Sequence, residues 1–325
     1  MMEEDHGLIA AYILNGKGKG TEIGWKEIRS WTPQMGILWV HLDYTSPEAQ
    51  KWIIQEAELE EVLSGALLKA ETRPRSILYD DSLLLTLRGV NLQPQSNPED
   101  MVAIRLWIEK NRIISTRKRR LLSEDDLRSA LEKGHGPKTS GEFLVYLTER
   151  LVERMSDVID QIDDDVDNLQ DQVLTMESHQ LRPIIAGYRR QAIGLRRYLG
   201  PQREALSKLY IERVQWLEDS DRMHLRETSD RMMRYIEDLD SSRERASVAQ
   251  EELMSRLSEN MEKRMYVLTL VATVFLPLSF ITGLLGINVG GVPGAENKTA
   301  FLIVCLILSG FAAIQFLIFK IKKWV

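Results

Sequence analysis

The sequence predicts a protein in three parts: an α/β domain, a long α-helical stalk and two transmembrane helices. Residues 1–135 alternate short β-branched or aromatic runs with turn residues, a pattern typical of strands joined by turns. Residues 139–264 carry apolar side chains at the spacing of amphipathic helices. Residues 265–319 contain two uncharged apolar runs of about 20 residues, the length that crosses a hydrocarbon core of about 30 Å.

Strand-like runs define the first domain. Asn111 lies at a probable tight turn between the last two of them, which predicts an antiparallel hairpin. The five runs are Leu8–Leu14, Ile37–Leu42, Leu83–Val90, Met101–Ile108 and Arg112–Thr116. Helices are expected to begin at Ser46-Pro47, an N-cap with a first-turn proline, and at Ser123, where Asp126 completes a capping-box pattern.

Composition and motifs exclude several classes of function. The sequence contains no GxGxxG, GxxxxGK(S/T) or HExxH motif, so we expect neither an enzyme nor a bound cofactor. The single cysteine, Cys305, excludes a disulfide within the chain. The net charge of -6 argues against nucleic acid as a partner. The basic run 117–120 is instead expected to pair with Glu124, Asp125 and Asp126.

A linker at 133–138 precedes a long helix that opens with a second capping-box pattern, Thr139 and Glu142. Its apolar positions recur at spacings of three, four and four residues, which keeps them on one face. They are Leu144, Leu147, Leu151, Met155, Val158, Ile162, Val166, Leu169 and Val173. The opposite face is acidic and carries Asp157, Asp160, Asp163, Asp164, Asp165, Asp167 and Asp171.

Two more helices complete the cytoplasmic part. One over Pro183–Leu217, bent at Gly200-Pro201, is expected to return antiparallel to the first. The other begins near Asp221 and meets no helix breaker before the first apolar run. We therefore predict one continuous helix of about 60 residues, about 90 Å long, that couples its base to its membrane end. Its apolar stripe is Met232, Ile236, Leu239, Ala246, Leu253 and Leu257, interrupted by Arg243 and Gln250, which we interpret as packing features.

Charges flanking the apolar runs predict their orientation. Lys263 and Arg264 precede the first run, and three lysines follow the second. Basic residues beside membrane helices stay in the cytoplasm, so both termini are expected there, with the loop outside. The expected boundaries are a first span at 265–286, an outer loop at 287–298, a second span at 299–319 and a basic tail at 320–325. Two helices cannot enclose a pore, so any transport path must be assembled from several copies.

One face of the first span has the side chains of an ion path. It narrows from bulky apolar residues on the cytoplasmic side to small or polar ones outside. Apolar rings gate by dewetting, and small polar rings admit a hydrated ion. The same face also suits packing against another helix, since small residues commonly serve that purpose in membranes. The face is Met265, Leu268, Ala272, Leu276, Ser279, Gly283 and Gly286.

The stretch Tyr266–Asn288, which reads YVLTLVATVFLPLSFITGLLGIN, resembles the pore helix of the CorA metal-ion transporter superfamily. That superfamily typically ends the helix in Gly-Met-Asn, whereas this chain has Gly286-Ile287-Asn288. The isoleucine variant, the following Val289–Gly294 and the segments Glu71–Arg75 and Leu83–Leu92 resemble its ZntB-type zinc-transporter branch. The resemblance covers nearly the whole chain.

The resemblance implies a funnel-shaped homopentamer in which five first spans line the pore. It implies transport of a divalent cation, with Zn²⁺ favoured and Mg²⁺, Co²⁺, Ni²⁺ or Cd²⁺ as alternatives. Influx is the first choice, with proton coupling or zinc efflux left open. It also offers the acidic helix face, Asp157 to Asp171, as a cation sensor, beside the plainer interpretation of a solvated surface. A membrane-anchored scaffold remains the alternative outside transport.

The entrance of the path is expected at the end of the first span. Neither span contains a charge or a histidine, whereas bare Zn²⁺ prefers imidazole, thiolate or carboxylate ligands. The ion is therefore expected to keep much of its water shell. Asn288 is the candidate entrance ring, with Gly286 allowing the chain to turn and Ile287 packing. Glu296 would attract cations at the mouth, or be a solvated charge offset by Lys298.

The five histidines show no paired metal-ligand spacing. Each is expected to be structural or exposed. His224, near the start of the long helix, is the one singled out for zinc or proton sensitivity.

Overall fold

The computed structural model describes residues 7–175, 180–212, 214–287, 294 and 297–322. The chain divides into two compact units, Met1–Glu251 and Glu252–Val325. The first unit holds a sheet and packed helices, and the second holds apolar helices. The long helix α7 begins in the first unit and ends in the second.

One sheet of seven strands forms the α/β part, in the order β2-β1-β3-β7-β6-β5-β4. Neighbours pair antiparallel except β3 and β7, which run parallel. The strands are β1 Leu8–Leu14, β2 Gly20–Glu22, β3 Ile37–Asp43, β4 Arg75–Tyr79, β5 Ser82–Gly89, β6 Val102–Ile108 and β7 Arg112–Arg117. The five predicted strands and the antiparallel β6–β7 hairpin are confirmed. Sequence reasoning missed β2 and β4, the short strands at the two edges of the sheet.

Both faces of the sheet are covered. On one face Leu38, Val40 and Leu42 of β3 pack with Ile53 and Leu67 in a buried core. The opposite face presents Trp39, whose ring meets Phe143 edge-on at 5.1 Å. This alternation follows from the period of two along a strand, and a near-continuous apolar run is typical of a strand buried on both faces. The helices here are α1 Trp25–Ser30, α2 Pro47–Gln55, α3 Glu61–Leu68 and α4 Leu122–Lys133, with a 3₁₀ turn at Pro33–Met35.

Of the two helix starts predicted in the α/β part, one is confirmed and the other is wrong. Helix α2 begins at Pro47 with Ser46 as its N-cap, as expected, although the serine side chain makes no cap bond. The capping box predicted at Ser123 is wrong, because α4 begins at Leu122 with the buried Leu121 as N-cap. Burial of Leu121 fixes the entry of the chain, and Asp126 binds Arg154 instead.

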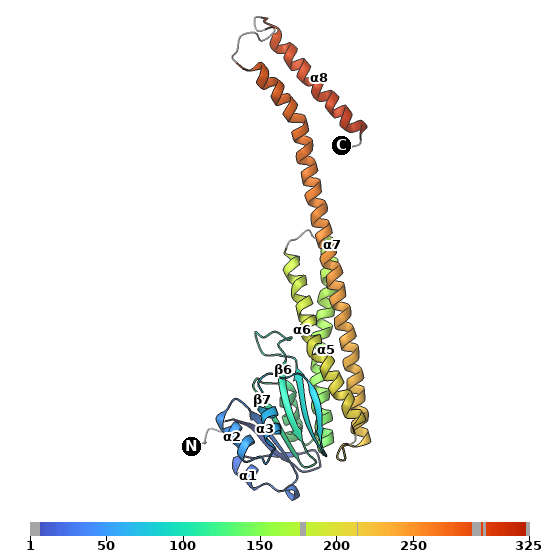
Figure 1. The fold of residues 1–325 in the computed structure, drawn as a ribbon. Helices are drawn as coiled ribbons and strands as arrows, with labels where there is room; N and C mark the ends of the chain where they lie inside the picture. The colour runs from blue at the N-terminus through green and yellow to red at the C-terminus, as the bar shows by residue number, and fades with distance from the viewer. Residues whose placement is uncertain (1–6, 176–179, 213, 288–293, 295–296, 323–325) are drawn as a thin grey trace. The chain divides into compact units, whose positions relative to one another are not determined.

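The long helices α5, α6 and α7 follow, and then the shorter α8. Figure 1 shows α5 beside α6. Helix α5 spans Ser140–Thr175, α6 spans Leu181–Ile211, α7 spans Asp219–Leu285 and α8 spans Ala300–Ile321. At the start of α5 the N–H of Glu142 donates to Thr139 Oγ1 at 3.0 Å, while the Glu142 carboxylate caps the N–H of Lys138 rather than that of Thr139. The single continuous helix predicted up to the membrane is confirmed by the 67 residues of α7.

The predicted end of the second long helix is wrong. Helix α6 stops at Ile211 rather than Leu217, and Pro201 lies inside it. Beyond the stop the indole of Trp216 donates to the Asp81 carbonyl at 2.7 Å. This contact draws the chain to the β4–β5 turn, a tertiary interaction that local sequence does not reveal.

Side-chain bridges fasten the long helices to the sheet and to one another. The Gln202 amide exchanges two hydrogen bonds with the Arg88 backbone, at 2.6 and 3.0 Å, and docks α6 on β5. Arg189 of α6 donates to Gln250 of α7 at 2.7 Å. The predicted packing role of Gln250 is therefore confirmed.

Candidate functional site

Helices α7 and α8 each contain a stretch long and apolar enough to cross a membrane. Figure 1 shows α8 beside the end of α7, and the Gln315 amide donates to the Thr273 carbonyl at 3.3 Å. The half-buried residues of α7 in this stretch are Leu270, Val274, Pro277, Leu278 and Ile281. Those of α8 are Ala300, Val304, Leu308, Ala312 and Gln315, with Phe319 buried. Both sets recur at three- or four-residue spacing, with one adjacent pair in α7, so each helix covers one stripe of the other.

The predicted pore face is the uncovered face of α7. Met265, Leu268 and Leu276 expose 58%, 63% and 75% of their surface. Ala272, Ser279, Gly283 and Gly286 are also exposed. At about 100° per residue, these positions cluster on the side of the helix opposite the half-buried stripe. The chain thus covers one side of its first span and leaves the other free.

Polar groups along this stretch are arranged to suit an apolar surrounding. The hydroxyls of Thr269, Thr273 and Thr282 each donate to a carbonyl of the preceding turn, at 2.8 to 3.0 Å. The N–H of Gly286 closes the helix on the carbonyl of Thr282 at 2.9 Å. A Cβ added to Gly283 would meet no atom within 4 Å, so packing inside the chain does not require glycine there.

Only some of the predicted entrance residues lie among the residues that the structure describes. Asn288 and Glu296 lie outside the described residues. Ile287, the middle residue of the entrance motif, is 53% exposed.

The acidic face of α5 is partly occupied by an arginine of α7. The Arg245 guanidinium forms ion pairs with both Asp163 and Asp167. Asp163 also accepts a hydrogen bond from Ser242 Oγ at 2.6 Å. Sequence reasoning missed Arg245, whose position on the facing helix becomes visible only once α5 and α7 are packed together.

Asp165 is half-buried and accepts a hydrogen bond from the Gln161 amide at 3.0 Å, and four other acidic residues of this face lie toward solvent. Asp157, Asp160, Asp164 and Asp171 are exposed. Asp238 on α7 is exposed, and partial desolvation together with the nearby Asp163 and Asp160 carboxylates raises its pKa. Within the described residues, no three His, Cys, Asp or Glu side chains form a group that would hold a metal ion.

His224 has a carboxylate neighbour. Its Nδ1 lies 3.0 Å from Glu149 Oε1, and the ring is largely exposed. It lines a pocket of about 370 Å³ with His135, Glu142 and Asp221. Burial raises the pKa of the Asp221 carboxyl. The hydrogen bond that this carboxyl accepts from the N–H of Glu218 opposes the shift.

His41 is structural. It is fully buried, with Nδ1 2.7 Å from Ser115 Oγ and Nε2 2.8 Å from Glu124. The predicted pairing of the basic run holds for Arg117 with Glu124 at 2.5 Å and for Arg120 with Asp125 at 2.9 Å. It is wrong for Asp126, which pairs with Arg154 of α5 because that helix packs on α4.

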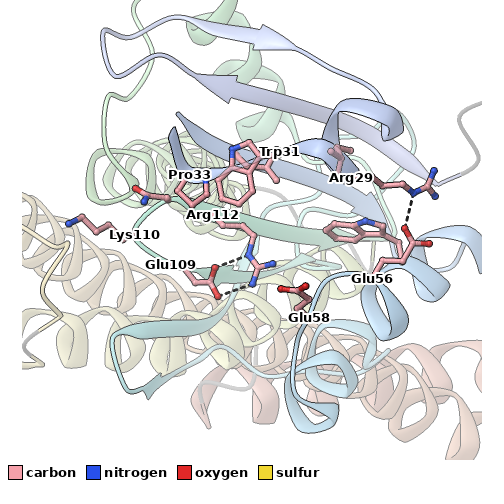
Figure 2. A pocket seen from close by; sticks show the side chains of 12 residues that line it. Arg29, Trp31, Pro33, Glu56, Glu58, Glu109, Lys110 and Arg112 are labelled. Carbon is pink, nitrogen blue, oxygen red and sulfur yellow. Dashed lines mark hydrogen bonds and ion pairs between the residues drawn. The ribbon is translucent and has the colours of Figure 1, made fainter. Parts of the chain in front are cut away.

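The two arginines that line a pocket of about 710 Å³ in the α/β part are already paired with carboxylates (Figure 2). Arg29 binds Glu56 at 2.8 Å, and Arg112 binds both oxygens of Glu109 at 2.7 and 3.0 Å. With these cations neutralised, we assign no ligand to the pocket.

Comparison with known proteins extends over the whole chain. A family model described as CorA-like Mg²⁺ transporter protein matches residues 34–323. The divalent cation transporter CmaX of Pseudomonas aeruginosa is 41% identical over 99% of this chain and 98% of its own length. The zinc transport protein ZntB of Pectobacterium carotovorum subsp. carotovorum is 38% identical over 93% of this chain and 91% of its own. The solved structure of full-length CmaX protein matches with a TM-score of 0.86 at 39% identity, over 100% of both chains.

Proposed function

The chain belongs to the family of CorA-like Mg²⁺ transporter proteins, a family of divalent-cation transporters and not of enzymes, and we propose that it carries Zn²⁺ through a homopentameric pore. The membrane would be the cell inner membrane, with both termini in the cytoplasm. Relatives named zinc transport protein ZntB support zinc as the cargo. The Gly286-Ile287-Asn288 motif supports the same choice.

The observation that carries the proposal is the uncovered face of α7. One side of the span is half-buried, and the opposite side, from Met265 to Gly286, is exposed and free of charge. Five copies of α7 arranged around an axis would turn this face toward one another. The proposed path is then a ring of apolar side chains that ends in the small residues Ser279 and Gly283.

Ion passage in this scheme relies on water rather than on direct ligands. The face offers hydroxyl and carbonyl oxygens, which suit hydrogen bonds to metal-bound water better than they suit bare Zn²⁺. Asn288 would ring the outer entrance and accept hydrogen bonds from that water. Glu296 would raise the local cation concentration, and the net direction of flux would be inward.

Sensing is proposed for the acidic face of α5 and for His224. A divalent cation held there would compete with Arg245 for Asp163 and Asp167, since a carboxylate cannot serve both fully. The exposed Asp157, Asp160, Asp164 and Asp171 would supply further oxygen ligands. Release of Arg245 would loosen α7 from α5.

Zinc uptake into proteoliposomes tests the cargo. We expect radioactive zinc to accumulate against excess magnesium, and a pH gradient to change the rate if protons are coupled. Zinc flux indifferent to the gradient would remove proton coupling, and flux abolished by magnesium would remove zinc selectivity. Asn288→Ala is expected to reduce flux; unchanged flux in inserted protein would favour the scaffold alternative.

Chemical cross-linking tests the assembly. The purified chain in detergent should give a ladder that ends at five subunits. A stable monomer or dimer would contradict the pore, because two spans of one chain enclose no channel.

A magnesium or cobalt channel of the same fold is the second candidate. The family model is described by Mg²⁺, and the relative CmaX is named for divalent cations in general. Faster uptake of magnesium or cobalt than of zinc in the same vesicles would favour it.

A further inference from the structure

A second pocket in the α/β part has a lining rich in positive charge. It measures about 230 Å³ and is bordered by Arg88, Arg105, Lys118 and Arg119. None of the described residues that line it is acidic. This composition contrasts with the larger pocket of Figure 2, where each arginine is paired with a carboxylate.

Arg105 is the most deeply buried cation that lines this pocket. It lies in the middle of β6 with 1% of its surface exposed. Its Nη2 donates to the Ala70 carbonyl at 3.0 Å, and its guanidinium lies 4.4 Å from the centre of the Tyr44 ring. Its Nε and Nη1 are buried and make no hydrogen bond of ordinary geometry to the described residues, and the Tyr44 side chain is the group that interacts with the guanidinium there. Buried donors without partners are costly, and a water molecule or an ion that accepts from them removes that cost.

Carbonyl groups hold two of the other cations in place without neutralising them. Arg88 donates to the carbonyls of Thr72 and Met101, each at 2.8 Å, and stacks on the Tyr198 ring. Arg119 donates to the carbonyls of Asp100 and Met101 at 2.9 and 3.0 Å. Their charges therefore remain available to an anion.

The basic run is divided between two roles. Arg117 and Arg120 bind carboxylates of α4, whereas Lys118 and Arg119 line the pocket. Burial is the largest effect on Arg88 and lowers its pKa, and the nearby Arg119 and Arg197 add to the shift. Tyr198 and Glu71 oppose it without reversing it. Positive charge is thus concentrated where β5, β6 and β7 lie side by side.

We propose that this pocket binds a phosphate group, supplied as inorganic phosphate or as the terminal phosphate of a nucleotide. Guanidinium groups present paired N–H donors that match the oxygens of a tetrahedral anion. A doubly charged anion balances more of the four cations than a carboxylate or chloride does. The volume suits a phosphate or diphosphate, so a nucleoside would extend outside the pocket.

Calorimetry on the purified full-length chain in detergent tests the site, with inorganic phosphate and ADP as separate probes. Both should bind the wild-type protein, and Lys118→Ala should weaken binding about tenfold because one charge-assisted hydrogen bond is lost. Arg120→Ala is the matched control, since Arg120 belongs to the same run but pairs with Asp125. It should leave the affinity within about twofold.

The outcomes are distinct. ADP bound more than tenfold tighter than phosphate identifies a nucleotide as the source, and equal affinities identify free phosphate. Absence of binding for both probes at millimolar concentration would overturn the proposal. Equal weakening by Lys118→Ala and Arg120→Ala would also overturn it, because it would indicate bulk charge. Lys118 is exposed, so its removal does not threaten the fold, and binding is measured independently of zinc flux.

Discussion

Apolar side chains are buried in the first half of α7 and exposed in its last part. In the first half Met232, Leu239 and Ala246 are buried against neighbouring helices. In the last twenty residues Phe275, Leu276 and Phe280 expose 62%, 75% and 70% of their surface. The helical periodicity is the same in both halves, so the difference lies in what covers it. The first half is covered by its own chain, and in the proposed pore the second half would be covered by lipid and by other copies.

The largest effect is expected at Gly283. Gly283→Phe should abolish divalent-cation flux, because five phenyl rings would fill the proposed path. Gly310→Phe on α8 is the matched control, since an added Cβ meets no atom within 4 Å at either glycine. Equal loss of flux in both variants would contradict the assignment of the uncovered face.

Leucine truncation compares the two halves of α7 directly. Leu239→Ala should lower the free energy of unfolding by about 2–5 kcal/mol, because a fully packed side chain is removed. Leu268→Ala, on the uncovered face, should cost less than about 1 kcal/mol. Denaturant unfolding of the detergent-solubilised chain measures both free energies. A larger loss for Leu268→Ala than for Leu239→Ala would contradict the comparison.

The ion pairs of Arg245 with Asp163 and Asp167 are expected to contribute less to the free energy of unfolding than the Leu239 side chain does. Arg245→Ala should destabilise the protein by about 1 kcal/mol, since the ion pairs are partly exposed and screened by water. It leaves Asp163 and Asp167 without their cation, so zinc or magnesium should stabilise the variant more than the wild type. Arg190→Ala, an exposed position on α6, is the control. Equal stabilisation by metal in both variants would argue against the proposed sensor.

The smallest effect concerns Asp238. Its folded-state pKa is raised, so the folded protein holds this proton more tightly and loses stability as pH rises from the unfolded pKa through the raised value. Asp238→Asn should therefore stabilise the protein at pH 7 but not at pH 3, by less than about 0.5 kcal/mol because the side chain is exposed. Thermal unfolding at the two pH values measures the difference.

Much of the fold follows from local pattern, and the misses share a cause. Period-two runs predicted five strands, and the unbroken helical stretch predicted α7. The edge strands β2 and β4, the end of α6 and the start of α4 depend on tertiary contacts, such as the bond of Trp216 to Asp81 and the burial of Leu121. Local propensity does not record such contacts.

The candidate site, like the fold, was predictable where it depends on local spacing and was missed where it depends on packing. The spacing from Met265 to Gly286 marks one face of a helix, and helix geometry alone sets it apart from the half-buried stripe. Arg245 and Arg105 went unnoticed because a single charged residue in a sequence carries no sign of its partner. Only packing brings Arg245 to Asp163 and buries the Nε and Nη1 nitrogens of Arg105 without a well-formed hydrogen bond.

Thiol accessibility tests the central claim most directly, because Cys305 is the single cysteine and one substitution removes it. In a Cys305→Ala background, Ser279→Cys lies on the uncovered face of α7 and Leu278→Cys on the half-buried stripe. A charged, membrane-impermeant thiol reagent should react with Ser279→Cys and stop divalent-cation flux in proteoliposomes, while Leu278→Cys stays unmodified and active. Reaction and block at Leu278→Cys, with Ser279→Cys untouched, would contradict the account.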